Sequence, residues 1–195
     1  MILYIIDTIR AGGDPMKSFD EILEQAFGDA DLQASEVPRI DLYMDQILTL
    51  VDEGLARNKR LPGDKLLTKT MVNNYSKERL IMPVRGKKYS RGQVMQLLCI
   101  LTLKQQLALS DIKKLVSCGQ DEMDFERAYT QALLMKDRLR GRLPELLREL
   151  VQPDGEMPGA REALLARSLA LCAAATQLRR VCEGLIDSWQ EDENI

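Results

Sequence analysis

The side chains best suited to chemistry in this sequence are basic, and they are concentrated in one stretch. Residues 57–91 hold 11 Lys and Arg residues against 2 acidic ones, a net charge of +9 in a protein whose overall charge is −3. Residues 1–56 carry −9 and residues 92–195 carry −3. So many like charges oppose folding unless they have a use. Phosphate binding is the commonest use, since each bound cation releases a counterion. The alternative is a solvated basic face that the acidic residues 1–56 neutralise.

The residues of the common catalytic and metal sites are scarce. There is no histidine, which removes the usual general base and the commonest zinc ligand. No Gly-rich phosphate loop, metal-ligand cluster or nucleophile elbow is present, so we expect no enzyme, cofactor or metal. No two cysteines form a CxxC pair, and we expect small buried hydrophobic residues in a reducing compartment. The four are Cys99, Cys118, Cys172 and Cys182.

Composition indicates a mainly helical protein. Hydrophobic residues make up 45% of the 195 residues and aromatic residues only 5%, and the abundant Leu, Ala, Glu, Lys and Arg favour helices. No apolar run reaches the 18 residues of a membrane span. The apolar start, Met1–Ile9, is short, contains Asp7 and lacks a basic segment, so we do not interpret it as a signal peptide. The expected location is the cytoplasm.

Capping residues and apolar spacing predict the elements that position the basic residues. Ser18 with Glu21 resembles a capping box, and Thr68 and Ser90 are expected N-caps. Gly86 centres a short basic segment that suits a two-stranded wing. The predicted helices cover 18–27, 38–55, 69–79, 90–107, 110–116, 121–151 with an interruption near Gly141 and Pro144, and 161–190; the predicted wing covers 82–89.

The predicted helix over 69–79 has one apolar and one polar face. Met71, Val72, Tyr75 and Leu80 are expected inside, which leaves the polar residues outside. Asn73 and Asn74 suit adenine edges and Lys69 suits guanine, whereas the other cations suit phosphates. The candidate DNA-binding residues are Lys69, Thr70, Asn73, Asn74, Lys77, Arg85, Lys87, Lys88 and Arg91.

The same residues could instead have purely structural or solvent-facing roles. Asn73 and Asn74 are also typical of a solvated helix face. Tyr75 and Tyr89 suit the core or the root of the wing better than base contacts. Lys65 and Arg79 could pair with Asp64 and Glu78 at the surface, where such pairs contribute little.

The order of these elements resembles the winged helix-turn-helix domain of MerR-type regulators. The resemblance rests on three groups of residues: Val72, Tyr75, Leu80, Ile81 and Pro83; Gly86, Lys87, Tyr89 and Ser90; and Leu109, Ser110, Asp111, Ile112 and Leu115. It implies an all-α fold with a small β-hairpin wing, and DNA binding. The segments LYMDQ (42–46) and LTKTMVNNY (67–75) also resemble an uncharacterised bacterial family, a domain of unknown function.

The last predicted helix carries an unbroken heptad seam. Its positions are Leu164, Ser168, Leu171, Ala175, Leu178, Cys182, Leu185 and Trp189. The seam could pack on the 121–151 helix as a hairpin within one chain, or form a coiled coil between two chains. We therefore divide the chain into a tail with a short helix (1–37), a winged helix-turn-helix domain (38–118) and a C-terminal oligomerisation region (119–195).

Together these features predict sequence-specific binding of duplex DNA by a transcription regulator, expected as a homodimer through the C-terminal helices and without a membrane. The alternative is a helical protein-interaction adaptor whose basic patch docks an acidic partner, because the same charge serves both roles.

Overall fold

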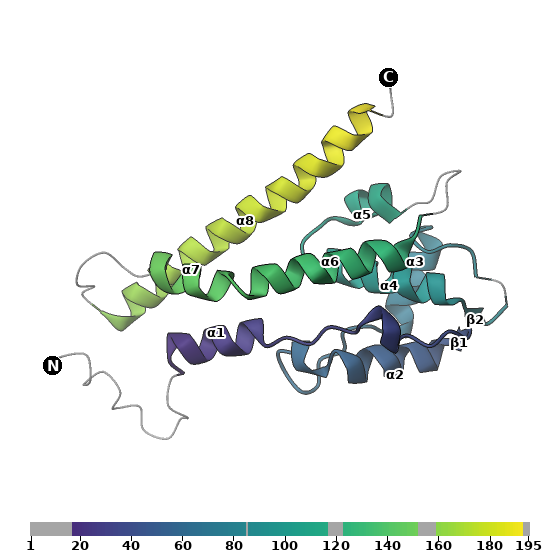
Figure 1. Ribbon diagram of the computed structural model, residues 1–195, viewed down its shortest axis with the longest axis horizontal. Helices are drawn as coiled ribbons and strands as arrows, with labels where there is room; N and C mark the ends of the chain where they lie inside the picture. Colours follow the sequence, from purple (N-terminus) through teal and green to yellow (C-terminus); the bar gives the residue numbers. More distant parts are fainter. Residues whose placement is uncertain (1–16, 85, 117–122, 152–158, 193–195) are drawn as a thin grey trace.

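The computed structural model describes residues 17–84, 86–116, 123–151 and 159–192, with side chains as far as Trp189. It is mainly helical with one small antiparallel sheet, as the sequence predicts (Figure 1). The elements in chain order are α1 (Phe19–Phe27), the 3-10 helix η1 (Ala34–Glu36), β1 (Leu42–Tyr43), α2 (Met44–Gly54), the 3-10 helix η2 (Ala56–Asn58), α3 (Lys69–Lys77), β2 (Lys88–Tyr89), α4 (Arg91–Leu103), α5 (Leu109–Val116), α6 (Phe125–Arg140), α7 (Leu143–Leu150) and α8 (Ala160–Asp192).

Helix α4 forms the centre of the core. Six consecutive residues, 93–98, are buried on it, followed by Ile100 and Leu101. A helix that is buried all round must be covered on several sides, and α5 and α6 both pack against α4. The core extends from Leu32 to Leu133 and adds Ile186 of α8, so it draws on all three regions of the predicted division.

Three helices, α1, α3 and α4, begin directly after the N-cap residues that the sequence predicts. Ser18 accepts a hydrogen bond from the Glu21 amide, and Glu21 accepts one from the Ser18 amide in return. Thr68 caps α3 by accepting from the Met71 amide, and a Ser90–Gln93 capping box opens α4. The predicted interruption near Gly141 is confirmed by the break between α6 and α7.

The sheet is present, but its two strands are not consecutive. Leu42 pairs with Tyr89 and Tyr43 pairs with Lys88, whereas the sequence analysis placed both strands of the wing within 82–89. The predicted second helix therefore begins at Met44, later than expected, because Leu42 and Tyr43 are extended. The pairing buries Leu42 and Tyr89 together and leaves Lys88 Nζ 5.0 Å from the centre of the Tyr43 ring.

The C-terminal helix leaves much of its apolar surface uncovered. Helix α8 meets α1, where Arg167 lies 5.4 Å from the Phe19 ring centre, and α5, where Ile186 is buried and Asp187 pairs with Lys114. It then diverges from α6 (Figure 1). Of the large seam residues, Leu164, Leu178, Leu185 and Trp189 are 45–67% exposed, whereas Leu171 is half-buried.

The cysteine prediction holds only in part. Cys99 of α4 is mostly buried, and burial raises the pKa of its thiol to about 11. Cys172 and Cys182 are exposed, so the prediction that they are buried is wrong, because the rest of the chain leaves these faces of α8 uncovered. Cys118 lies outside the described residues. Within the described residues, none of the helices is both long and apolar enough to span a bilayer.

Candidate nucleic-acid interface

Helix α3 presents one polar face to solvent. Val72 is fully buried and Tyr75 is 3% exposed, which anchors the opposite face in the core. The five polar residues predicted to point outward are all exposed: Lys69, Thr70, Asn73, Asn74 and Lys77. They recur at helical spacing, so they form a single stripe along α3.

The end of α3 is fixed by a turn that glycine usually occupies. Arg79 adopts a left-handed conformation with φ of 58°. The Arg79 amide donates to the Ser76 carbonyl at 3.1 Å and the Leu80 amide donates to the Tyr75 carbonyl at 2.9 Å, which is the Schellman arrangement. Leu80 then enters the core beside Tyr75, and the chain turns from α3 toward the segment before β2.

The segment over 81–89 lies beside the start of α3. A hollow of about 520 Å³ separates them, and Lys69 of α3 and Lys87 of this segment both line it, together with Tyr43 of β1. Lys87 and Lys88 are exposed. The fold therefore brings Lys69, at the start of α3, and Lys87 of the predicted wing to the same hollow. Arg85 lies outside the described residues.

Two glutamines that the sequence analysis did not single out hold this segment. Gln96, 1% exposed, accepts from the Met82 amide at 2.9 Å and donates to the Val116 carbonyl at 3.0 Å. Gln93 donates to the carbonyls of Met82 and Pro83. Gln93 lies three residues after the predicted N-cap Ser90, a spacing that could have pointed to it, whereas Gln96 lies within an apolar stripe and gives no separate signal.

Tyr75 and Tyr89 belong to the core, as the structural alternative to base contacts predicts. Both are buried. Burial raises the pKa of the Tyr89 hydroxyl, against a smaller opposite effect of its hydrogen bond with Ser76. Neither ring is therefore placed to stack on a base.

Ion pairs divide the basic residues into two groups. Lys59 and Lys65 both pair with Asp52, at 2.8 and 3.5 Å, so acidic residues before position 57 do neutralise part of the block. The proposed Lys65–Asp64 pair does not form, because Asp64 instead accepts from the Leu61 amide. Among the described residues, the cations without an acidic partner within 4.0 Å include Lys69, Lys77, Arg79, Lys87 and Lys88.

Arg91 forms hydrogen bonds and an ion pair within the protein. It donates to both carboxylate oxygens of Glu126, each at 2.8 Å, and to the carbonyls of Ala34 and Val37. Its side chain is only 18% exposed. The hydrogen bond with Glu126 raises the pKa of Arg91 and lowers that of Glu126. Arg91 thus links α4 to α6 and η1, and its side chain is not free to join the proposed interface.

One acidic group lies within the same surface. Asp45 of α2 lines the hollow with Lys69 and Lys87 and forms no ion pair within 4.0 Å among the described residues. Across the described part of the chain, no group of three or more His, Cys, Asp or Glu residues is placed to hold a metal ion.

Comparison with known proteins gives one match. A family described as Domain of unknown function (DUF1836) matches residues 32–133, a range that contains β1, the sheet pairing, α3 and the buried part of α6. No curated protein and no solved structure matches the chain.

Proposed function

This chain belongs to the DUF1836 family, and we propose that it binds duplex DNA through α3 and the segment leading to β2, as a sequence-specific transcription regulator. One observation supports the proposal: four exposed lysines lie on α3 and in the segment leading to β2, and none of them has an acidic partner within 4.0 Å among the described residues. They are Lys69 and Lys77 of α3, and Lys87 and Lys88 beside or within β2.

The arrangement suits a helix inserted in the major groove. The first residues of such a helix face base edges, and in α3 these include Lys69, Thr70 and Asn73. Asn side chains pair with adenine and Lys with guanine. Lys77, Lys87 and Lys88 would then contact phosphates on either side and fix the orientation without reading sequence. Arg85 remains a predicted phosphate contact from the sequence alone.

A salt titration tests the phosphate contacts. In the Lys87→Ala/Lys88→Ala variant we expect weaker binding to every duplex, and a slope of log K against log salt that is shallower by about 2, since each lost phosphate contact removes about 0.9. Arg138→Ala/Arg180→Ala removes two exposed cations elsewhere and is the control. The probe is the duplex upstream of the protein's own gene, with a scrambled competitor.

Sequence recognition is tested separately. Asn73→Ala should alter the preference among duplexes and leave the salt slope nearly unchanged. If the Lys87→Ala/Lys88→Ala variant is folded and binds duplexes like the parent at every salt concentration, the assignment of this surface to DNA is wrong. Failure of the parent to bind any duplex, with retention of an acidic protein, would support the adaptor alternative.

We propose further that two copies join through α8. Leu164, Leu171, Leu178 and Leu185 repeat at heptad spacing, and all but the half-buried Leu171 are exposed. The small residues Ser168, Ala175 and Cys182 lie between them. Leu165 and Val181 flank this seam and are also about 60% exposed. Two-fold pairing would bury all of these at once and present two α3 helices to an inverted repeat.

Light-scattering mass in solution tests the pairing. Leu178→Glu should convert a dimer to a monomer, because it places a charge in the seam. Leu169→Glu is the matched control, since Leu169 is equally exposed, at 62% against 64%, but lies off the seam. A monomeric parent, or equal effects of the two substitutions, would contradict pairing through this seam.

A further inference from the structure

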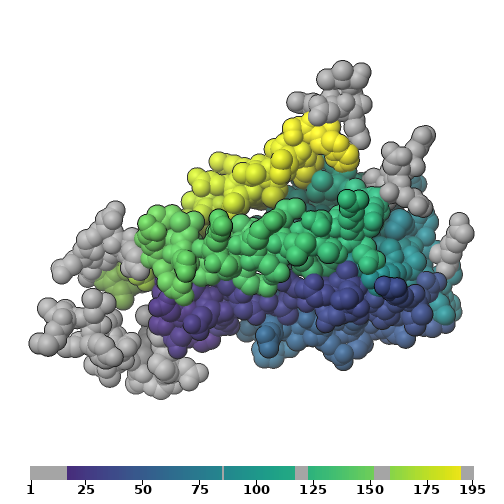
Figure 2. Space-filling view, in the orientation of Figure 1, coloured from purple at the N-terminus to yellow at the C-terminus, as the bar shows by residue number. Residues whose placement is uncertain are grey.

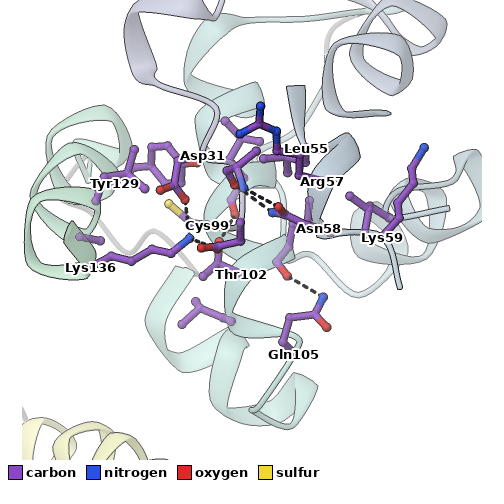
Figure 3. Close-up of a pocket in the computed structure, with 18 of the residues that line it drawn as sticks. Asp31, Leu55, Arg57, Asn58, Lys59, Cys99, Thr102, Gln105, Tyr129 and Lys136 are labelled. Atoms are coloured by element: carbon purple, nitrogen blue, oxygen red, sulfur yellow. Dashed lines mark hydrogen bonds and ion pairs between the residues drawn. The ribbon is translucent and has the colours of Figure 1, made fainter. Parts of the chain in front are cut away.

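A second, larger hollow lies near the C-terminal end of α2, whereas the basic interface lies near its N-terminal end. It has a volume of about 1080 Å³, at the upper end of the range for small-molecule sites. Its walls come from α1, η2, α4 and α6. Figure 3 shows Tyr129 and Lys136 of α6 facing Arg57 and Asn58 of η2 across it. Protein interiors pack densely with few voids, so a hollow of this size suggests a ligand-binding site.

The walls along the hollow are mainly apolar. Leu98 and Leu101 of α4 lie opposite Phe125 and Leu133 of α6, and Leu55 closes the end of α2. These five side chains are buried or nearly so within the chain. In the space-filling view, α6 covers the front of this region (Figure 2). Apolar lining residues that stay partly or largely open, Leu66, Leu103, Leu115 and Met123, continue this surface and suit a hydrocarbon chain, which gains by leaving water.

Most of the charged groups that line the hollow are already paired. Lys136 bonds to Asp29 and, at 2.5 Å, to Asp31. Lys59 pairs with Asp52. Arg57 and Arg60 are the exception among the described lining residues, since neither has an acidic partner within 4.0 Å and both are exposed at the rim. The unbalanced charge of the site is therefore positive and lies at one end of it.

Hydrogen bonds hold the two sides of the hollow in place. Asn58 of η2 exchanges two bonds with the backbone of Ala30, at 2.7 and 2.9 Å. Arg140 of α6 bonds to Asp31 at 2.7 Å. Because the loop between α1 and η1 is tied to both α6 and η2, the site is formed before any ligand binds, which lowers the cost of binding.

We propose that this cavity binds a single-chain amphiphile with an anionic head group, of which a medium- or long-chain fatty acid is the simplest. The hydrocarbon chain lies along the open apolar lining at Leu66, Leu103 and Leu115, and the carboxylate lies at Arg57 and Arg60. The inference does not depend on DNA binding, because neither arginine belongs to the proposed interface.

Competition against a fluorescent fatty acid, on the full-length protein and below the aggregation concentration of each ligand, tests the proposal. Dodecanoic acid should bind about fivefold more tightly than dodecanol, the gain expected from two exposed charge contacts. It should bind about fifteenfold more tightly than decanoic acid, because two methylenes are removed from water. Dodecyltrimethylammonium, whose head group is cationic, should bind more weakly than both dodecanoic acid and dodecanol.

Matched variants separate the head-group site from the chain site. Arg57→Ala/Arg60→Ala should abolish the preference for the acid over the alcohol and leave dodecanol binding unchanged. Ala132→Trp, on an exposed position of α6 that lines the hollow, should weaken both ligands. Arg138→Ala/Arg180→Ala should change neither. No saturable binding by the parent, equal binding of the cationic ligand, or parental affinity in Ala132→Trp would each overturn the proposal.

Discussion

Arg91 offers a direct test of whether a basic residue belongs to the fold or to the interface. The substitution is Arg91→Ala, which removes the bidentate pair with Glu126 and two bonds to the carbonyls of Ala34 and Val37. The two bonds from a charged group to partly buried carbonyls contribute about 1.5 kcal/mol each. The Glu126 pair adds less than about 1 kcal/mol, because that carboxylate is 47% exposed. The expected loss of unfolding free energy is about 3 kcal/mol.

Urea unfolding followed by circular dichroism measures this loss. With a urea dependence of about 2 kcal/mol per molar, the midpoint should fall by about 1.5 M. Glu126→Gln should lower it much less, because it leaves the carbonyl contacts in place. Arg138→Ala, an exposed arginine on α6, is the control. An unchanged midpoint in Arg91→Ala, combined with a salt slope for DNA shallower by about 1, would refute this structural role and return Arg91 to the interface.

Three further predictions concern stability. Arg79→Gly should stabilise the protein by about 1 kcal/mol in urea unfolding, because the left-handed conformation suits glycine; Lys77→Gly, within α3, should destabilise it instead. Gln96→Leu should destabilise by about 1–3 kcal/mol, because the Met82 amide loses its acceptor, and an unchanged midpoint would contradict that role. For Asp31, burial raises the pKa, but hydrogen bonds from Lys136 and Arg140 together outweigh it and lower the pKa below its ordinary value near 3.8. The stabilisation is therefore present above that value and lost as the pH falls below it, so Asp31→Asn should flatten the acid limb of a pH–stability profile.

The helices were predictable because their signals are local. A capping residue and its partner lie three positions apart, as in Ser18–Glu21 and Ser90–Gln93, and each pair forms in the structure. The outward face of α3 followed from spacing in the same way. These features depend on the backbone within one or two turns, which the order of residues determines almost by itself.

The sheet was misplaced because its pairing is not local. Gly86 and the basic residues around it favoured a hairpin, but β2 pairs with Leu42 and Tyr43, more than forty residues earlier. Apolar spacing over 42–55 suited a helix throughout, and only the burial of Leu42 against Tyr89 shows where the strand ends and α2 begins. The large hollow could not be predicted either, because its lining residues come from many separate parts of the chain, from α1 to α6.

Counting charges along the chain identifies where cations are concentrated, but pairing in the fold decides which of them remain available. Asp52 and Glu126 both lie outside residues 57–91, and between them they form ion pairs with Lys59, Lys65 and Arg91. No spacing rule anticipates these pairs, because they depend on how α2, α4 and α6 meet. Several cations of the block have no acidic partner within 4.0 Å among the described residues, and they lie in two places. Lys69, Lys77, Lys87 and Lys88 lie on α3 and beside β2, whereas Arg57 and Arg60 lie by η2 at the larger hollow. The fold thus divides the basic block between two hollows of different size, and the larger of them has the more apolar lining.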